Sequence, residues 1–248
     1  CRGLCDSFIW LKQERYSELT KDTNTQARFG QRVYETAQQI HEVASSPVLT
    51  PIFAQFEKGN PAGILGQMLE SQGLSSTLAE MRKYVTTARL GAAEKKDALT
   101  RLNQLENLMG TLQTEMQNAV INPSNLRTEY EKSSLPNLRN TQDAFIRGIR
   151  YIANEGLTKY ENQFALQRAA KTPQFDPMYW STNPVLAETI HNSTQRRNDI
   201  VSSPGTQDLP AFMRGSIDEA AFRGKTPAKE GKKKPTVKEL REQANKPD

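Results

Sequence analysis

The sequence predicts an all-α protein, an elongated helical bundle with a long coiled-coil-like helix and a Pro/Lys-rich C-terminal tail. Three observations support this fold class. Apolar residues recur at steps of three and four positions, which places them on one face of a helix. Prolines and glycines separate these stretches, as expected where helices end. Sustained alternation of apolar and polar residues, the pattern of a half-buried strand, is missing from the sequence.

The composition limits the core to narrow apolar stripes. Hydrophobic residues make up 36% of the 248 residues, and the 14 glycines raise this to about 41%, against ~45–50% in an average globular protein. The mean hydropathy is -0.71. The most apolar stretch, residues 45–56, holds two prolines and is too short to span a bilayer, which needs about 20 residues. We therefore expect a thin helical core and no transmembrane segment.

Two helices are predicted at the N-terminal end, over residues 6–19 and 25–44. The apolar residues of the first helix are Phe8, Trp10, Leu11 and Tyr16. Those of the second recur at steps of three and four and share one face: Phe29, Val33, Ala37, Ile40 and Ala44. Pro47 and Pro51 then interrupt the helical pattern.

Two shorter helices are expected before residue 91. Pro61 suits the first position of a helix, because its missing N–H has no partner there, and Gly73 is expected to cap the C-terminal end. The next helix begins at Ser75 or Ser76 and runs to about Leu90.

A helix over residues 92–121 carries the most regular pattern in the sequence. Its apolar residues alternate at steps of three and four, which is a heptad seam. The seam consists of Leu102, Leu105, Met109, Leu112 and Met116. Asn122 and Pro123 end the helix. Two interpretations stay open: the seam packs inside one chain, or it mediates self-association or insertion into a multi-chain assembly.

A third long helix is predicted over residues 136–170, with Pro136 at its start. Gly148 and Gly156 lie in its interior, where each costs about 1 kcal/mol relative to alanine. They permit either a close contact between helices or a bend. One more helix is expected over residues 185–200.

An aromatic cluster lies between these last two helices, in a stretch with three prolines. It consists of Phe175, Tyr179 and Trp180. The cluster either covers one end of the bundle or is an exposed anchor for a protein partner, since Trp and Tyr are favoured at interface hot spots.

We expect two regions, a helical body over residues 1–201 and a tail over 202–248. Proline and glycine punctuate the tail, and two short stretches in it fit a capping box followed by apolar residues. We interpret the tail as a docking segment that binds other protein subunits, including copies of this chain. Its candidate partner-binding residues are Phe212, Phe222, Val237 and Leu240.

The tail also supplies most of the net charge. Residues 225–248 carry eight basic and four acidic side chains, which give +4 of the total charge of +5. Two interpretations of this charge stay open: the tail is a solvated segment that aids solubility, or it binds nucleic acid or an anionic membrane weakly and in a salt-sensitive way. The sequence offers no other region for such binding.

The sequence lacks the local signatures of catalysis and of cofactor binding. The two histidines, His41 and His191, each lie in a predicted helix. No glycine-rich phosphate loop and no metal-ligand spacing occurs, so we expect no cofactor and no metal. We predict a protein that is not an enzyme. The alternative is an enzyme whose site is assembled only in the fold, around one of the histidines.

Cys1 leaves two interpretations open. In one, it is the lipidated cysteine of a mature bacterial lipoprotein, and the helical body lies in the periplasm. In the other, the sequence starts inside a longer chain, and the protein lies within a large assembly such as a virion.

These observations favour a structural or assembly component of a larger protein complex. In composition the chain is similar to helical, Gln/Asn-rich, non-enzymatic components of secretion or conjugation machinery and to internal proteins of phage virions. The expected working surfaces are helix faces and the C-terminal docking tail.

Overall fold

A computed structural model describes residues 2–55, 68, 73–121 and 141–202. These residues form six α-helices and two 3-10 helices, and no strand occurs among them. The predicted all-α fold class is therefore confirmed. The chain divides into two units, Cys1–Phe212 and Met213–Asp248, and every described residue belongs to the first unit.

The first helix, α1 (Arg2–Ala44), is continuous over 43 residues. The sequence predicted two separate helices in this region, and that prediction is wrong. The polar stretch between them contains neither proline nor glycine. Two threonine hydroxyls there donate to carbonyl oxygens one turn earlier, Thr20 to Tyr16 at 2.8 Å and Thr25 to Lys21 at 2.9 Å. Both side chains therefore satisfy their polar groups without breaking the helix.

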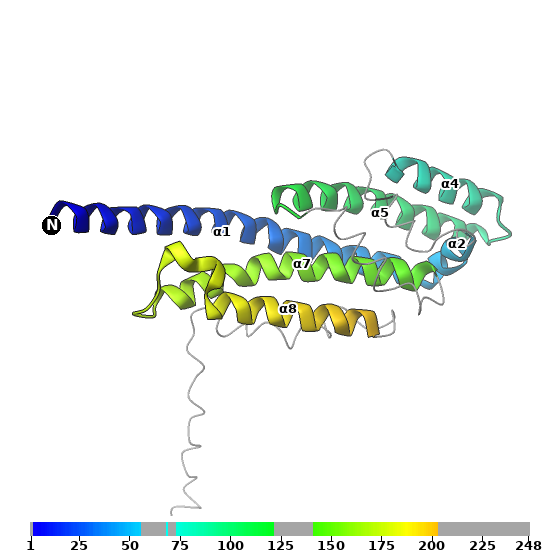
Figure 1. The fold of residues 1–248 in the computed structure, drawn as a ribbon. Coiled ribbons are helices and arrows are strands. Elements are labelled where there is room, and N and C mark those ends of the chain that lie inside the picture. Colours follow the sequence, from blue (N-terminus) through cyan, green and yellow to red (C-terminus); the bar gives the residue numbers. More distant parts are fainter. Residues whose placement is uncertain (1, 56–67, 69–72, 122–140, 203–248) are drawn as a thin grey trace, which may run out of the picture. The chain divides into compact units, whose positions relative to one another are not determined.

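α1 lies between two pairs of helices (Figure 1). One pair consists of α4 (Gly73–Thr87) and α5 (Ala92–Asn118), and the other of α7 (Thr141–Ala170) and α8 (Pro184–Ser202). α5 and α7 contact α1 directly, while α4 packs on α5 and α8 packs on α7. Each pair thus reaches α1 mainly through its inner helix.

The C-terminal end of α1 is closed by a side chain from α7. Gln142 is 7% exposed, and its amide donates to the carbonyl oxygens of Ala44 at 2.6 Å and Ser46 at 3.3 Å. The Thr50 hydroxyl donates to Gln142 Oε1 at 2.8 Å. Gln142 therefore pairs carbonyl groups that a helix end leaves without a partner. Two short helices follow the turn, η1 (Pro47–Leu49) and α2 (Thr50–Gln55).

The start of α4 corrects one predicted helix end. Gly73, expected as a C-terminal cap, lies in α4 instead, and the Ser76 hydroxyl donates to its carbonyl oxygen at 3.1 Å. Leu74 is 7% exposed, so the chain already contributes to the core at this point. The predicted start of the preceding helix, at Pro61, lies outside the described residues.

The turn between α4 and α5 is capped at Gly91. The Gly91 N–H donates to Glu94 Oε2 at 2.9 Å, as in half of a capping box. α4 ends at Thr87, before the predicted end near Leu90.

α5 ends in a left-handed turn at Val120, which has a φ of 56°. The Val120 N–H donates to Gln117 O at 3.1 Å, and the Ile121 N–H donates to Met116 O at 2.9 Å. These two bonds define a Schellman motif, in which glycine is the usual left-handed residue. Ile121 and Met116 are buried and supply the apolar contact of the motif, whereas Val120 is 69% exposed. A β-branched residue is strained in this conformation.

The heptad seam of α5 is fully buried in the described structure. Its residues have no exposed surface: Leu102, Leu105, Met109, Leu112 and Met116. Ion pairs flank it, between Arg82 of α4 and Glu106 and between Arg32 of α1 and Glu115. The seam packs on neighbouring helices of the same chain here, and self-association through it stays a prediction.

α7 is enclosed on most of its surface. All side chains from Ala144 to Leu157 are buried except the half-buried Arg147 and Glu155. At Gly156 the helix meets Gly30 of α1 backbone to backbone, so the close contact left open in the sequence is present. The predicted start of this helix at Pro136 lies outside the described residues.

Candidate functional site

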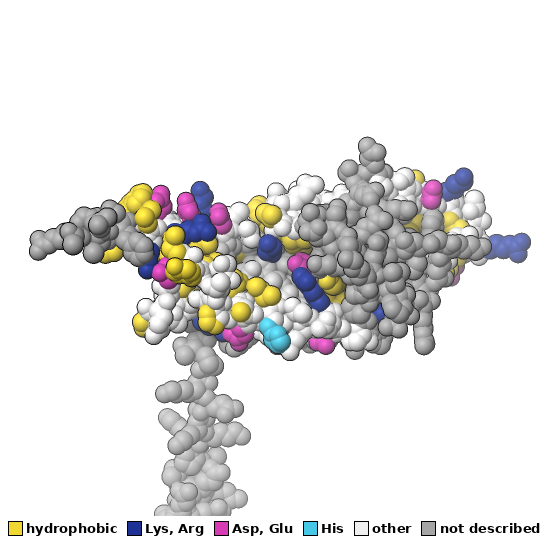
Figure 2. Space-filling model, in the orientation of Figure 1, with side chains coloured by type: hydrophobic (Ala, Val, Ile, Leu, Met, Phe, Trp, Pro, Cys, Tyr) yellow, Lys and Arg dark blue, Asp and Glu magenta, His cyan; other side chains and the backbone are white. Residues whose placement is uncertain are grey.

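Large apolar side chains are exposed near the start of α1. Ile9 is 63% exposed, Trp10 60% and Leu11 48%. Successive residues of an α-helix point about 100° apart, so these three side chains face different directions. Apolar residues of a helix that packs in a bundle instead share one face. Figure 2 shows hydrophobic side chains, with charged ones among them, on α1 next to its grey N-terminal end and over η2 (Pro177–Thr182).

η2 and the residues before it dock on the same part of α1. Lys12 Nζ lies 2.5 Å from Asp176 Oδ2, and the rings of Tyr16 and Phe175 meet edge-on with centroids 5.9 Å apart. Asp176 Oδ1 also accepts a hydrogen bond from the Met178 N–H at 3.1 Å. The hydrogen bond from Lys12 and that from Met178 lower the pKa of the Asp176 carboxyl. An ion pair and an aromatic contact thus fix η2 to α1.

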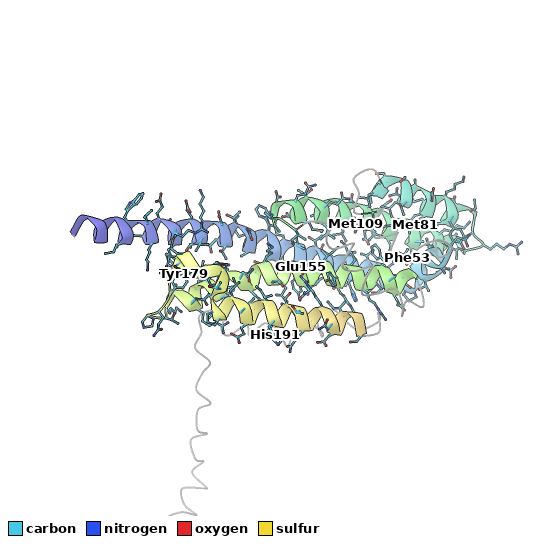
Figure 3. The ribbon with its side chains drawn as sticks, viewed as in Figure 1. Phe53, Met81, Met109, Glu155, Tyr179 and His191 are labelled. Atoms are coloured by element: carbon cyan, nitrogen blue, oxygen red, sulfur yellow. The ribbon has the colours of Figure 1, made fainter. Side chains whose placement is uncertain are left out.

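Two further large side chains of η2 are exposed beside this contact. Met178 is 55% exposed and Tyr179 is 69% exposed. Figure 3 marks Tyr179 on η2, next to α1. We call five large apolar residues of this region, each at least 48% exposed, the α1–η2 surface: Ile9, Trp10, Leu11, Met178 and Tyr179. Aromatic and methionine side chains are enriched in protein–protein interfaces.

The three residues of the predicted aromatic cluster differ in exposure. Phe175 and Trp180 are half-buried, and their rings pack edge-on with centroids 6.4 Å apart. Tyr179 is exposed. Phe175 and Trp180 therefore form the base of the α1–η2 surface, and Tyr179 belongs to its outer part.

A polar arrangement joins α7 to α8, and we call it the α7–α8 polar contact. Arg196 Nε donates to Asn154 Oδ1 at 2.7 Å, and the guanidinium binds both carboxylate oxygens of Glu161, at 3.1 and 2.6 Å. Asn154 Nδ2 donates to Ser193 Oγ at 3.1 Å, and Thr158 Oγ1 lies 2.7 Å from the same oxygen. Burial raises the pKa of the Glu161 carboxyl, while the hydrogen bond and charge of Arg196 oppose that rise.

A second ion pair extends this contact. Arg197 Nε donates to Glu155 Oε1 at 3.0 Å, and its guanidinium lies 5.4 Å from the centroid of the Tyr151 ring. Figure 3 marks Glu155 on α7. These groups hold two helices together, and each charge is partnered, as buried charges require.

The two histidines lie in different environments. His41 is buried, and its Nε2 lies 3.3 Å from Arg150 Nη2. His191 is exposed on α8 (Figure 3). Within the described ranges, no group of three or more His, Cys, Asp or Glu side chains is placed to hold a metal ion. The described helices also include none that is both long and apolar enough to cross a bilayer.

Several predicted binding residues lie outside the described residues. They are Cys1, the candidate lipidation site, and the tail residues Phe212, Phe222, Val237 and Leu240.

Two signals in the sequence could have identified the features that sequence reasoning missed. Residues 8–11 are four consecutive apolar residues, which is more than one helical face can bury. Asn154, Thr158 and Glu161 recur at steps of four and three, the spacing of one helical face. A polar stripe at helical period indicates a polar helix contact, as an apolar stripe indicates a core.

The chain matches no protein-family model, and comparisons with curated proteins and with solved structures find no match. Function is therefore inferred from the α1–η2 surface and from the helices that position it.

Proposed function

We propose that the protein is a non-enzymatic structural component of a larger protein assembly, and that it binds another protein subunit through the α1–η2 surface. The exposure of large apolar side chains carries this proposal: Ile9, Trp10 and Leu11 are exposed around α1, and Met178 and Tyr179 are exposed on η2, which docks on the next turns of α1. Burying one such side chain fully contributes about 1.5–3 kcal/mol. A few side chains of this kind supply most of the binding free energy in a typical interface.

The base of the surface supports binding because it is already ordered. Tyr16 and Phe175 pack edge-on, and Lys12 is paired with Asp176. Side chains that are fixed before binding lose less conformational entropy when the complex forms.

The charge of the surface favours a protein partner over nucleic acid. Lys12 and Asp176 neutralise each other at its base, and the exposed Arg15 on the next turn is paired with Glu18. Nucleic-acid binding depends on unpaired Lys and Arg that neutralise phosphates, whereas the centre of a protein interface is depleted in charge.

Photo-crosslinking in the native cell tests the proposal directly. A photo-reactive benzoylphenylalanine replaces Trp10 in the full chain, and a matched control replaces Gln39, which is an exposed polar residue of α1. We expect irradiation to give a covalent protein adduct of discrete mass from position 10 and none from position 39. An adduct at twice the chain mass of 27.9 kDa identifies the partner as a second copy.

Two results would contradict the proposal. Equal adducts from both positions would indicate random collision, and crosslinks to lipid alone would indicate a membrane-facing surface.

The C-terminal residues 202–248 provide a second, independent contact in this proposal. Its support is the pair of capping-box stretches in the sequence. A chain that ends at Ser202 should keep the adduct at position 10 and lose any partner bound by the tail. If truncation leaves every interaction intact, the docking role of the tail is wrong.

A further inference from the structure

α8 is held on α7 mainly by polar side chains. The buried residues of α8 are Thr189, Ser193, Arg196 and Ile200, of which Ile200 alone is apolar among the side chains that the structure describes. Val185 and Leu186 are half-buried. α5 differs, because it buries six apolar residues with no exposed surface: Ala98, Leu102, Leu105, Met109, Leu112 and Met116.

This difference determines how firmly each helix is held. Apolar burial supplies most of the free energy of helix packing. A buried ion pair such as Arg196–Glu161 contributes little net stability, because the loss of hydration offsets the attraction. α8 is therefore held less firmly than α5, although its buried polar side chains are hydrogen-bonded.

The polar contacts do fix the alignment of the two helices. Arg196 binds Asn154 and Glu161 together, and Asn154 also binds Ser193. A shift of α8 by one turn would break all of these directional bonds at once. One alignment therefore satisfies the buried polar groups.

The junction before α8 separates it from the part that is fixed to α1. Asn183 has an extended backbone with φ -68° and ψ 133°, and its Oδ1 accepts from the Val185 N–H at 3.0 Å, which caps α8. Pro184 keeps the preceding residue out of the helical region. The ion pair of Lys12 with Asp176 holds the segment before the junction on α1.

We propose that α8 is a strap that opens from α7 as one unit about Asn183–Pro184 and closes again in a single alignment, while α1, α5 and α7 stay folded. Opening uncovers a polar face of α7 that includes Asn154, Thr158 and Glu161. Local opening of a helix with few buried apolar residues is a known mode of sub-global unfolding.

Native-state hydrogen exchange of the full chain, followed by mass spectrometry, tests the strap. Amides of residues 187–200 should exchange at least about tenfold faster than those of the α5 core and of the enclosed part of α7. Equal protection of α8 and α7 would overturn the proposal.

Two variants, each at an ion pair between α7 and α8, distinguish separate opening of α8 from a general loss of stability. Glu161→Gln removes the buried pair with Arg196, and Glu188→Gln removes the exposed pair with Arg168, in which both side chains are more than half exposed. Relative to the original chain, we expect Glu161→Gln to accelerate exchange in α8 about tenfold and Glu188→Gln to accelerate it less than about twofold. In both variants α5 exchange should stay unchanged.

Either of two results in Glu161→Gln would overturn the strap. Faster exchange in all helices alike would show that α8 does not open separately, and unchanged exchange in α8 would show that the polar contact does not hold it. If Glu161→Gln fails to fold, Ser193→Ala removes one hydroxyl of the same contact and is judged by the same pattern.

Discussion

Gly30 of α1 and Gly156 of α7 leave no room for a methyl group between the two helices. A Cβ atom added to Gly30 would lie 2.5 Å from the carbonyl oxygen of Gly156. One added to Gly156 would lie 2.6 Å from the carbonyl oxygen of Gly30. The obstacle on each side is backbone, which cannot turn aside as a side chain can. The two glycines therefore set how closely α1 and α7 approach.

We predict that Gly30→Ala and Gly156→Ala each destabilise the fold. Alanine gains about 1 kcal/mol in helix propensity, but separating the two backbones costs more because it loosens the packing along both helices. Overpacking costs about 1–3 kcal/mol, so the net loss in the free energy of unfolding is up to about 2 kcal/mol after the gain in propensity. Urea unfolding followed by circular dichroism measures it.

Gly110→Ala is the matched control for these variants. Gly110 lies inside α5, and a Cβ atom there would meet nothing within 4 Å apart from its chain neighbours and the backbone of its own helix. We expect this substitution to stabilise the protein by up to about 1 kcal/mol, because propensity acts without a clash. If all three alanine variants shift the urea midpoint in the same direction, the close contact does not govern their effect.

We predict that Val120→Gly stabilises the protein. Val120 has a φ of 56° at the end of α5, where a side chain branched at Cβ is strained and glycine is not. The gain should be about 0.5–1 kcal/mol after the greater chain entropy of glycine in the unfolded state is subtracted. Thermal unfolding should show a higher midpoint for Val120→Gly and no gain for Val120→Ile. A lower midpoint for the glycine variant would contradict the left-handed turn.

We predict that Gln142→Ala destabilises the turn after α1. The variant leaves the carbonyl oxygen of Ala44 without the amide that donates to it at 2.6 Å. The expected loss in the free energy of unfolding is about 2–3 kcal/mol. Gln142→Glu keeps the size of the side chain but has no N–H to donate, so it should cost at least as much. A glutamate variant as stable as the original chain would show that the carbonyl groups do not depend on residue 142.

We predict that acid weakens the docking of η2 on α1. The Asp176 carboxyl has a lowered pKa in the folded state. Its ionised form therefore stabilises the fold at pH values above the ordinary pKa of an aspartate, about 3.9. That stabilisation is lost as the pH falls through the lowered pKa of the folded state. In a Trp10→Phe chain, the fluorescence of Trp180 should report the change below about pH 4. The same titration with Asp176→Asn should lack this step, and a step that persists would assign it to another group.

Sequence reasoning predicted the long helices because their apolar residues follow the helical period closely. Val33, Ala37 and Ile40 were expected on one face, and all three have no exposed surface. The continuity of α1 could not be predicted in this way, since Thr20 and Thr25 have low helix propensity and their bonds to carbonyl oxygens appear only in three dimensions.

Only part of the α1–η2 surface could be predicted from the sequence. The sequence offers Tyr179 as an anchor for a partner in one of two interpretations, but it places Trp10 among the apolar residues of a bundle helix. Whether an apolar side chain is covered depends on where the neighbouring helices end, and that is a property of the packing. The α7–α8 polar contact was missed for a related reason, because polar residues such as Asn154 usually indicate a solvated face.

Because α1 is unbroken, the direction in which Ile9, Trp10 and Leu11 point depends on residue count. Each residue lengthens an α-helix by 1.5 Å and turns it by about 100°. Removing one residue from the polar stretch after Thr20 would leave in place the contacts that later residues of α1, such as Gly30, make with α7. It would nevertheless turn the exposed end by about 100° and separate Lys12 from Asp176. A change of seven residues would restore the direction to within about 20°, but it would move the end by about 10.5 Å along the helix axis and would also separate Lys12 from Asp176. The length of this stretch is therefore constrained even though its composition is not.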